Sequence, residues 1–268
     1  MGERIFMKAR ISICLAAIAA VSLGTSQAGP SSILEEPVII PEEEAGLSFR
    51  IAPYLWGTWL DGTMGIGGNL TDVNVGFDDI LKNLDFAAMG ALELRNGRWG
   101  LGADLFYAEV SVEGQTPLGI FFTDARLKQR QFIGNFTASY AVYEDHSRVF
   151  DLFAGARVNY INLKMTLSGG PTPRISLSDD VTWVDPIIGG RYRASITDRW
   201  FYQIGGDIGG FGINSDLTWQ AQGMLGYEFN ELFSMGLGYR ALGTDYSKDG
   251  FLYDIVSHGP VLGFEFKF

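Results

Sequence analysis

The sequence has few cysteines and histidines, and beyond its first residues it has no long apolar run. Its 268 residues include one cysteine, Cys14, and two histidines. If residues 1–28 are removed, as argued below, the remaining chain can have no disulfide, thiolate metal site or cysteine nucleophile. The net charge of −11 argues against nucleic acid as a partner. From residue 29 onward, glycine or charge interrupts every apolar run, so no segment resembles a transmembrane helix.

The first 28 residues predict a secretory signal peptide. Basic Lys8 and Arg10 precede an apolar stretch from Ile11 to Leu23, and Ser26-Gln27-Ala28 is a small-x-small cleavage site. A retained membrane anchor is the alternative, but the stretch is shorter than the ~20 residues that a span needs. Residues 29–46 follow as an acidic, proline-containing linker, expected in the periplasm. We therefore expect a signal peptide (1–28), a linker (29–46) and one domain (47–268).

Apolar residues alternate with polar or small residues in the predicted last strand. Leu262, Phe264, Phe266 and Phe268 form one set, whereas the alternate positions carry Gly263, Glu265 and Lys267. Such alternation is typical of a β-strand between two environments. The apolar face could meet the core of a soluble sheet, or it could meet lipid around a membrane barrel.

The same unit, an alternating segment followed by a polar connection, recurs along residues 47–268. Short connections such as Asn96-Gly97, a strong hairpin signal, alternate with longer polar segments such as 61–85 and 111–125. This alternation is typical of the turns and loops of a bacterial barrel. Ten strands are predicted, at about 47–60, 86–96, 98–110, 126–142, 148–166, 181–196, 199–212, 216–229, 232–246 and 255–268.

The apolar faces of these strands have aromatic residues near their ends and aliphatic residues between them. In residues 98–110, Trp99 and Tyr107 flank Leu101, Ala103 and Leu105. That arrangement is the aromatic girdle around a lipid band. We therefore predict an all-β fold, an antiparallel transmembrane β-barrel of ten strands, with eight or twelve as alternatives. Residues 61–77 could form a hairpin above the membrane, and the count would be twelve if that hairpin joined the wall. A soluble, secreted all-β protein is the competing interpretation.

The opposite faces carry equal numbers of cations and anions. Strand parity points Arg50, Arg95, Arg157, Arg191, Arg193, Arg240 and Lys267 inward, together with Glu93, Asp104, Asp151, Asp185, Asp207, Glu228 and Glu265. Because unpaired charges in a narrow lumen are costly, we predict an interior network of ion pairs. Its main candidates are Asp104, Asp185, Asp207, Arg157, Arg191, Arg193 and Arg240.

Several segments together resemble a family. PYLWGTWLDGTMGIGG (53–68), NGRWGLGADLFY (96–107), WVDPIIGGRYR (183–193), GYRALGTDY (238–246) and HGPVLGFEFKF (258–268) are the main ones. They resemble a group of small proteobacterial outer-membrane barrels, mostly of uncharacterised function and loosely akin to OmpA-like and OmpW-like proteins. The resemblance implies a Gram-negative outer-membrane location. It also implies that the C-terminal phenylalanine is presented to the barrel-assembly machinery.

The two histidines give little support for catalysis. His146 lies in a predicted periplasmic turn, and His258 follows Ser257, so that their side chains point to opposite faces. Asp254 is a further neighbour along the same strand, so a catalytic triad is not expected. Asp72, Asp78, Asp79 and Asp85 fit no calcium-loop spacing, and Asp78-Asp79 instead predicts the start of one short helix.

The resulting functional expectation is broad. We expect an outer-membrane protein of structural or surface-interaction type, without enzymatic activity, metal or cofactor. The partners expected are outer-membrane lipid, the assembly machinery and an unknown surface ligand, and not nucleic acid. A narrow, porin-like pore or transporter for small solutes is the first alternative. An enzyme acting on lipid or peptide is the weaker one.

Overall fold

The structure is a computed structural model that describes residues 46–66, 69–115, 124–169 and 173–268. The predicted signal peptide and residues 29–45 of the predicted linker lie outside the described residues.

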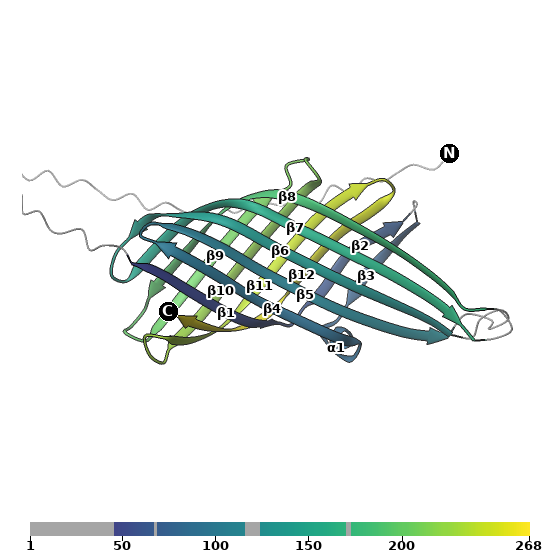
Figure 1. Ribbon diagram of the computed structural model, residues 1–268, viewed down its shortest axis with the longest axis horizontal. Helices are drawn as coiled ribbons and strands as arrows, with labels where there is room; N and C mark the ends of the chain where they lie inside the picture. The colour runs from purple at the N-terminus through teal and green to yellow at the C-terminus, as the bar shows by residue number, and fades with distance from the viewer. Residues whose placement is uncertain (1–45, 67–68, 116–123, 170–172) are drawn as a thin grey trace, which may run out of the picture. The chain divides into compact units, whose positions relative to one another are not determined.

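Ten antiparallel strands form a closed barrel (Figure 1). From β4 to β12 each strand pairs with the next, and β1 pairs with both β4 and β12, which closes the ring. The strands are β1 (Leu47–Trp56), β4 (Leu84–Asn96), β5 (Trp99–Gln115), β6 (Asp124–Glu144), β7 (Arg148–Ser168), β8 (Ile175–Ser195), β9 (Trp200–Gly209), β10 (Ser215–Glu228), β11 (Phe233–Lys248) and β12 (Phe251–Lys267). The predicted ten-stranded, all-β antiparallel barrel is confirmed, and the alternatives of eight and twelve strands are wrong.

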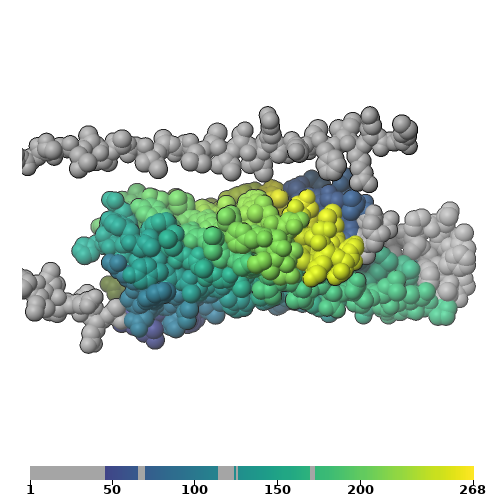
Figure 2. All heavy atoms as spheres, turned by 90° about the horizontal axis from the view of Figure 1, so that it is seen from above, coloured from purple at the N-terminus to yellow at the C-terminus, as the bar shows by residue number. Residues whose placement is uncertain are grey.

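The prediction of one strand over residues 47–60 is wrong. β1 ends at Trp56, and after Gly57 and Thr58 the chain forms a hairpin of β2 (Trp59–Ile66) and β3 (Asn69–Val75). Because β2 pairs with the first half of β12 and β1 with the second half, the hairpin extends one edge of the wall and adds no strand to the ring. Figure 2 shows this hairpin, in dark blue, beside the yellow residues of the C-terminal strands.

A short helix connects the hairpin to β4. It is α1 (Phe77–Lys82), with Asp78 and Asp79 in its first turn, as the acidic start of the segment predicts. Within the described residues no helix has the length and apolar character needed to span a bilayer.

At one end of the barrel, which we call the turn end, all four hairpin connections are short, at residues 97–98, 145–147, 196–199 and 229–232. At Asn96-Gly97 the turn residues are Gly97 and Arg98, with a positive φ of 54° at Gly97 and none at Asn96. The type I′ turn that Asn-Gly favours needs two positive φ angles. The predicted hairpin is present, but its turn has only one positive φ. The β2–β3 hairpin and the far ends of β5–β8 form the opposite end, called the loop end. There β5 runs to Gln115 and β6 starts at Asp124, so the predicted connection 111–125 is shorter than expected.

The barrel wall is apolar outside and polar inside over most of its height. Leu101, for example, is 60% exposed on the outer face, whereas Arg157 is 0% exposed inside. Aromatic pairs border the outer band near the turn end, where the Trp99 and Tyr140 rings lie 5.0 Å apart and the Trp200 and Tyr227 rings 5.1 Å apart. This arrangement is the reverse of a soluble protein and leaves the interior to charged side chains.

At the loop end the two faces exchange character. Trp183, Tyr246 and Tyr253 form a buried cluster inside, with the Trp183 and Tyr246 rings stacked 4.3 Å apart. Leu60, Met64 and Val73 of the hairpin pack against this cluster. The other face of the hairpin is polar, and it carries Asp61 hydrogen-bonded to Asn74 and Thr63 hydrogen-bonded to Asp72.

Candidate functional site

The charged interior is built by the two-residue period of the strands. Glu93 and Arg95 on β4, Arg191 and Arg193 on β8, and Glu265 and Lys267 on β12 are alternate residues, so each pair points to the same side of the wall. Glycines make room for this interior. A Cβ at Gly226 would lie 2.1 Å from the ring of Phe201, which in turn lies beneath the guanidinium of Arg193 at 3.7 Å. Only glycine at that position allows the ring to support the cation.

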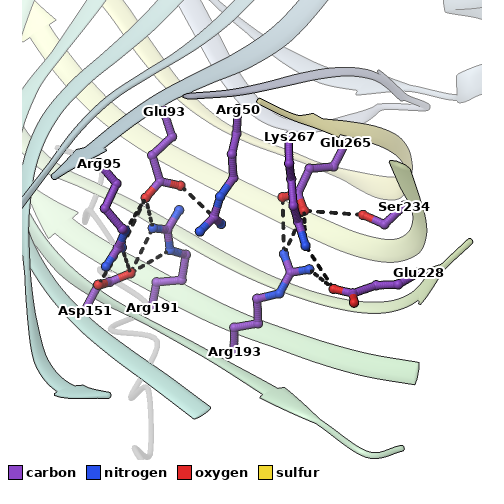
Figure 3. A network of polar contacts seen from close by, with 10 residues as sticks. All are labelled: Arg50, Glu93, Arg95, Asp151, Arg191, Arg193, Glu228, Ser234, Glu265 and Lys267. Carbon is purple, nitrogen blue, oxygen red and sulfur yellow. Dashed lines mark hydrogen bonds and ion pairs between the residues drawn. The ribbon is translucent and has the colours of Figure 1, made fainter. Parts of the chain in front are cut away.

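The first interior group joins β1, β4, β7 and β8 (Figure 3). The Arg95 Nη2 atom lies 2.8 Å from an Asp151 oxygen and 3.1 Å from Glu93 Oε1. Arg191 Nη2 lies 2.8 Å from oxygens of the same two carboxylates, and Arg50 Nη1 lies 3.7 Å from Glu93. Since β4 is not adjacent to β7 or β8 in the sheet, the Arg95–Asp151 and Arg191–Glu93 pairs cross the lumen and connect different parts of the wall.

A second group occupies the lumen beside the first (Figure 3). The Arg193 guanidinium lies 3.0 Å from Glu228 and 3.2 Å from Glu265. Lys267 Nζ lies 3.1 Å from Glu228 and 3.7 Å from Glu265. Ser234 Oγ donates a hydrogen bond of 3.3 Å to Glu265. The two cations and two carboxylates come from three strands, β8, β10 and β12, and each charge has more than one partner.

A third group is more deeply buried and includes neutral polar side chains. Arg157 Nη2 lies 2.8 Å from Asp207, while its other nitrogens donate to Thr218 and Asn135, both at 2.7 Å. The Asn135 amide donates to Asp104 at 3.2 Å, which joins this pair to the next one. All three nitrogens of this fully buried guanidinium therefore donate hydrogen bonds, as a buried cation requires.

Arg240 completes the third group. Its Nη2 lies 2.9 Å from Asp104 and donates to Gln220 at 2.7 Å, and its Nη1 donates to the Tyr54 hydroxyl at 3.1 Å. The Tyr54 hydroxyl donates in turn to Asp104 at 2.7 Å. The guanidinium carbon lies 4.8 Å from the centre of the Trp56 ring, a cation–π distance.

Among the candidates for the network, Asp185 is the exception. Arg157, Arg191, Arg193, Arg240, Asp104 and Asp207 all form ion pairs with other inward charges. Asp185 is 0% exposed, and none of the described Lys, Arg or His side chains pairs with it. It accepts hydrogen bonds from the Ser215 amide (2.9 Å), the Ser215 hydroxyl (2.6 Å) and Trp183 Nε1 (3.1 Å). Its carboxylate holds the start of β10 beside the aromatic cluster.

The predicted lipid-facing set also has a defined position. On β12 the even-numbered Leu262, Phe264 and Phe266 face away from the lumen, which receives Glu265 and Lys267. Phe268 follows the strand, exchanges two backbone hydrogen bonds with Phe49, and is 71% exposed. The C-terminal residue is thus held to β1.

Sequence reasoning missed the neutral members of the interior and the partners of His258. Asn135, Thr218, Gln220 and Tyr54 lie inward, and strand parity could have placed them there had neutral residues been considered. No sequence signal connects the partners of His258. Its Nε2 lies 2.9 Å from Asp61 and its Nδ1 lies 2.6 Å from the Tyr239 hydroxyl.

A cavity of about 200 Å³ lies next to these groups. Arg50, Glu93 and Arg191 line it, together with Asp104, Asn135 and Asp207. Because a water molecule in the liquid takes up about 30 Å³, the cavity has room for several waters but not for a wide channel. Among the described residues no cluster of three or more His, Cys, Asp or Glu side chains is arranged to hold a metal ion.

Comparison with known proteins finds similar architectures only. No protein-family model and no curated protein matches the sequence. The outer membrane protease OmpT from Escherichia coli aligns over 84% of this chain and 98% of its own, at 10% identity and a TM-score of 0.48. The transport unit of the autotransporter AIDA-I from Escherichia coli covers 85% and 92%, at 10% identity and 0.43. Neisserial surface protein A covers 83% and 99%, at 10% identity and 0.33. No functional property is carried over at these scores.

Proposed function

We propose that this protein is an integral barrel of a Gram-negative outer membrane, closed by its interior ion pairs, that acts through its loop end as a structural or surface-interaction protein. The observation that carries the proposal is the lumen itself. All seven inward cations and six of the seven inward anions pair with one another, several of them across the barrel. The proposal includes no catalytic activity.

The outer surface supports a membrane location. Large apolar side chains such as Leu101, Leu152, Ile188, Ile204 and Leu237 are about half exposed or more around the barrel. A soluble protein rarely exposes so extensive an apolar surface. A bilayer would cover it, and the closed ring of hydrogen-bonded strands leaves few backbone groups of the wall unpaired in lipid.

The interior supports a closed rather than an open barrel. Cross-lumen pairs such as Arg95–Asp151 and Arg193–Glu265 occupy the part nearer the turn end. The aromatic cluster of Trp183, Tyr246 and Tyr253 occupies the part nearer the loop end. Barrels of about eight strands are filled by side chains, whereas those of sixteen hold water. Ten strands with these fillings leave no wide path.

Conductance in planar bilayers tests closure. Wild-type protein refolded into the bilayer should show little steady current, and Asp207→Ala or Arg240→Ala should conduct more or unfold earlier, because each leaves a buried charge unpaired. A stable, large conductance of the wild type would contradict closure. The cavity of about 200 Å³ makes a narrow pore the second candidate, and a saturable, ion-selective wild-type current would favour it.

Location and assembly have tests of their own. Cell fractionation should place the protein in the outer membrane, and recovery as a soluble periplasmic protein would contradict the proposal. Deletion of Phe268 removes the backbone pairing with Phe49 and the terminal aromatic residue, so it should lower the amount of folded barrel. The assembly machinery is the partner that we propose for this strand. A Phe268→Tyr variant, which keeps the ring and the backbone, serves as the control.

A further inference from the structure

The wall of the barrel contains a seam at the loop end. β1 pairs with β4 only as far as Pro53 and Gly90. Beyond that point the chain continues into β2, which pairs with β3 and not with β4. Residues Leu84–Met89 of β4 pair only with β5. The two sides of the wall therefore separate, with α1 as the covalent connection between them.

One side of the seam is the free edge of β3. β3 is the last strand in the sheet order, and no described strand pairs with its outer edge. In an antiparallel pair, alternate residues direct their N–H and C=O groups away from the neighbour, so this edge presents unused hydrogen-bonding groups. On the opposite side, the Ser111 amide donates to the Asn83 carbonyl of the connection, and where β1 and β4 part, the Trp56 amide donates to Met89 Sδ at 3.3 Å.

The edge is anchored to the barrel and suited to accept a strand. The hairpin is fixed to β12 by pairs from Trp59–His258 to Ile66–Phe251. α1 is fixed to the hairpin through Phe77, whose ring lies 5.6 Å from that of Trp59. The sequence of β3, NLTDVNV, is rich in β-branched residues and lacks proline and lysine, with which exposed edges are usually protected.

The surroundings of this edge are acidic. Asp72 lies on β3, Asp78 and Asp79 begin α1, and Asp85 begins β4. Lys82 pairs with Asp79 at 3.7 Å, and Lys128 lies 3.8 Å from Asp85. Asp72 and Asp78 form no ion pair within the part of the chain that the structure describes. An incoming strand would therefore be favoured if it carried lysine or arginine.

We propose that the free edge of β3 docks an extended, basic peptide segment of a partner protein, which adds a strand to the hairpin. A second copy of β3 is disfavoured because Asp72 of each copy would approach the other. The acidic segment 29–45, with five glutamates, is disfavoured by the same repulsion. It also joins the barrel at Leu47, which pairs with Asn96 at the turn end, far along β1 from the hairpin.

The test uses a labelled peptide of about ten residues that alternates lysine with threonine and valine, titrated onto the whole barrel in detergent micelles. Fluorescence anisotropy should show saturable binding. N-methylation of alternate amides of the peptide keeps its charge but removes the N–H groups that would bond to the edge of β3. Binding should then weaken by at least about tenfold. Asp72→Lys should weaken binding by about tenfold, and the same variant should prefer a glutamate version of the peptide.

Asp216→Lys is the matched control, since Asp216 is an exposed acid on β10, away from the seam. It should bind the lysine peptide as the wild type does, and both variants should keep the wild-type unfolding midpoint. Equal binding of the N-methylated peptide, or no binding at all, would overturn the proposal. So would self-association of the wild type that Asp72→Lys abolishes, because a second copy would then occupy the edge.

The inference rests on the proposed function only in placing the loop end outside the membrane. Conductance tests the lumen and peptide binding tests the edge, so either can fail alone.

Discussion

In the two halves of β12, polar and apolar side chains occupy opposite faces of the wall. Near the turn end, Glu265 points inward and Phe266 points outward. Near the loop end, Ile255 is 2% exposed inside, whereas Asp254 is exposed outside. The strand and its two-residue period are continuous, so the backbone does not cause the change. Each face of the strand therefore follows its own surroundings, which in the proposed membrane placement are lipid and a polar lumen in one half, and water and an apolar cluster in the other.

The largest expected effect comes from breaking the polar lumen at its most buried cation. Arg157→Ala should leave the Asp207 carboxylate without its guanidinium and lower the free energy of unfolding by about 3–5 kcal/mol. Urea unfolding of the barrel in lipid vesicles, followed by the gel shift of the folded form, measures it. Arg148→Ala at the exposed turn end is the control. Similar stabilities for the two variants would show that the lumen pairs contribute little.

The second test concerns the outer face in the turn-end half. Phe264→Arg should lower the free energy of unfolding by about 2–4 kcal/mol, the cost of arginine on a lipid face near the bilayer midplane. Gly263→Ser, one residue away on the lumen face, should be nearly neutral. A Cβ there would lie 3.6 Å from Met224 and 3.8 Å from Tyr54, which is ordinary contact. If both variants lost the same stability, this assignment of inner and outer faces would be refuted.

Cysteine labelling along β12 should locate the position at which its outer face changes from water-exposed to lipid-facing. Single cysteines at the outward positions 254, 258, 262 and 264 of β12 can be treated with a membrane-impermeant maleimide on intact cells. Positions 254 and 258 should react because water surrounds them, and 262 and 264 should not. Each outward site keeps its backbone pairing, and only the cysteine at 258 also removes side-chain hydrogen bonds, those of His258 with Asp61 and Tyr239. Labelling at 264 would place water where we expect lipid.

The smallest effect is expected in the turn between β6 and β7, outside both halves. The Asp145 carboxylate accepts hydrogen bonds from the Tyr143 hydroxyl (2.6 Å) and the Ser147 amide (2.8 Å), which lower its pKa to about 2. Because the folded-state pKa is lower than the unfolded value, this stabilisation is complete above about pH 4 and disappears as the pH falls through 2. Asp145→Ala should unfold at slightly lower urea than the wild type at pH 7, with the difference vanishing near pH 2. A difference independent of pH would exclude the carboxylate as its source.

Strand number and the inner and outer faces could be predicted from sequence because both depend on local periodicity. The alternation of Trp99, Leu101 and Leu105 with glycines and Asp104 requires no knowledge of neighbours. Because the inward cations and anions are equal in number, the existence of an ion-pair network could also be predicted. The individual partners were not predictable, since Arg157 and Asp207 lie 50 residues apart and meet only when the barrel has closed.

The hairpin of residues 61–77 was considered from the sequence, but the way in which β2–β3 meets the wall escaped prediction for a different reason. A period of two residues does not reveal which face is outside, so Leu60 and Met64 could equally have faced lipid. Only the position of the hairpin beyond the end of β1, against Tyr253 on β12, makes their face the inner one. Asp185 was assigned to the ion pairs by parity, but its partner Ser215 was neutral and was not considered.

The pairing of β12 with both β1 and β2 also affects the order in which the protein can mature. The last strand of the domain is the one that covers the edges of its first two strands. Until it arrives, those edges remain open, and a chain lacking β12 keeps them open permanently. The ring can therefore close only in a chain that has been translated through β12, and only such a chain can become compact and resistant to proteases. Truncated products would keep unpaired strands and be degraded.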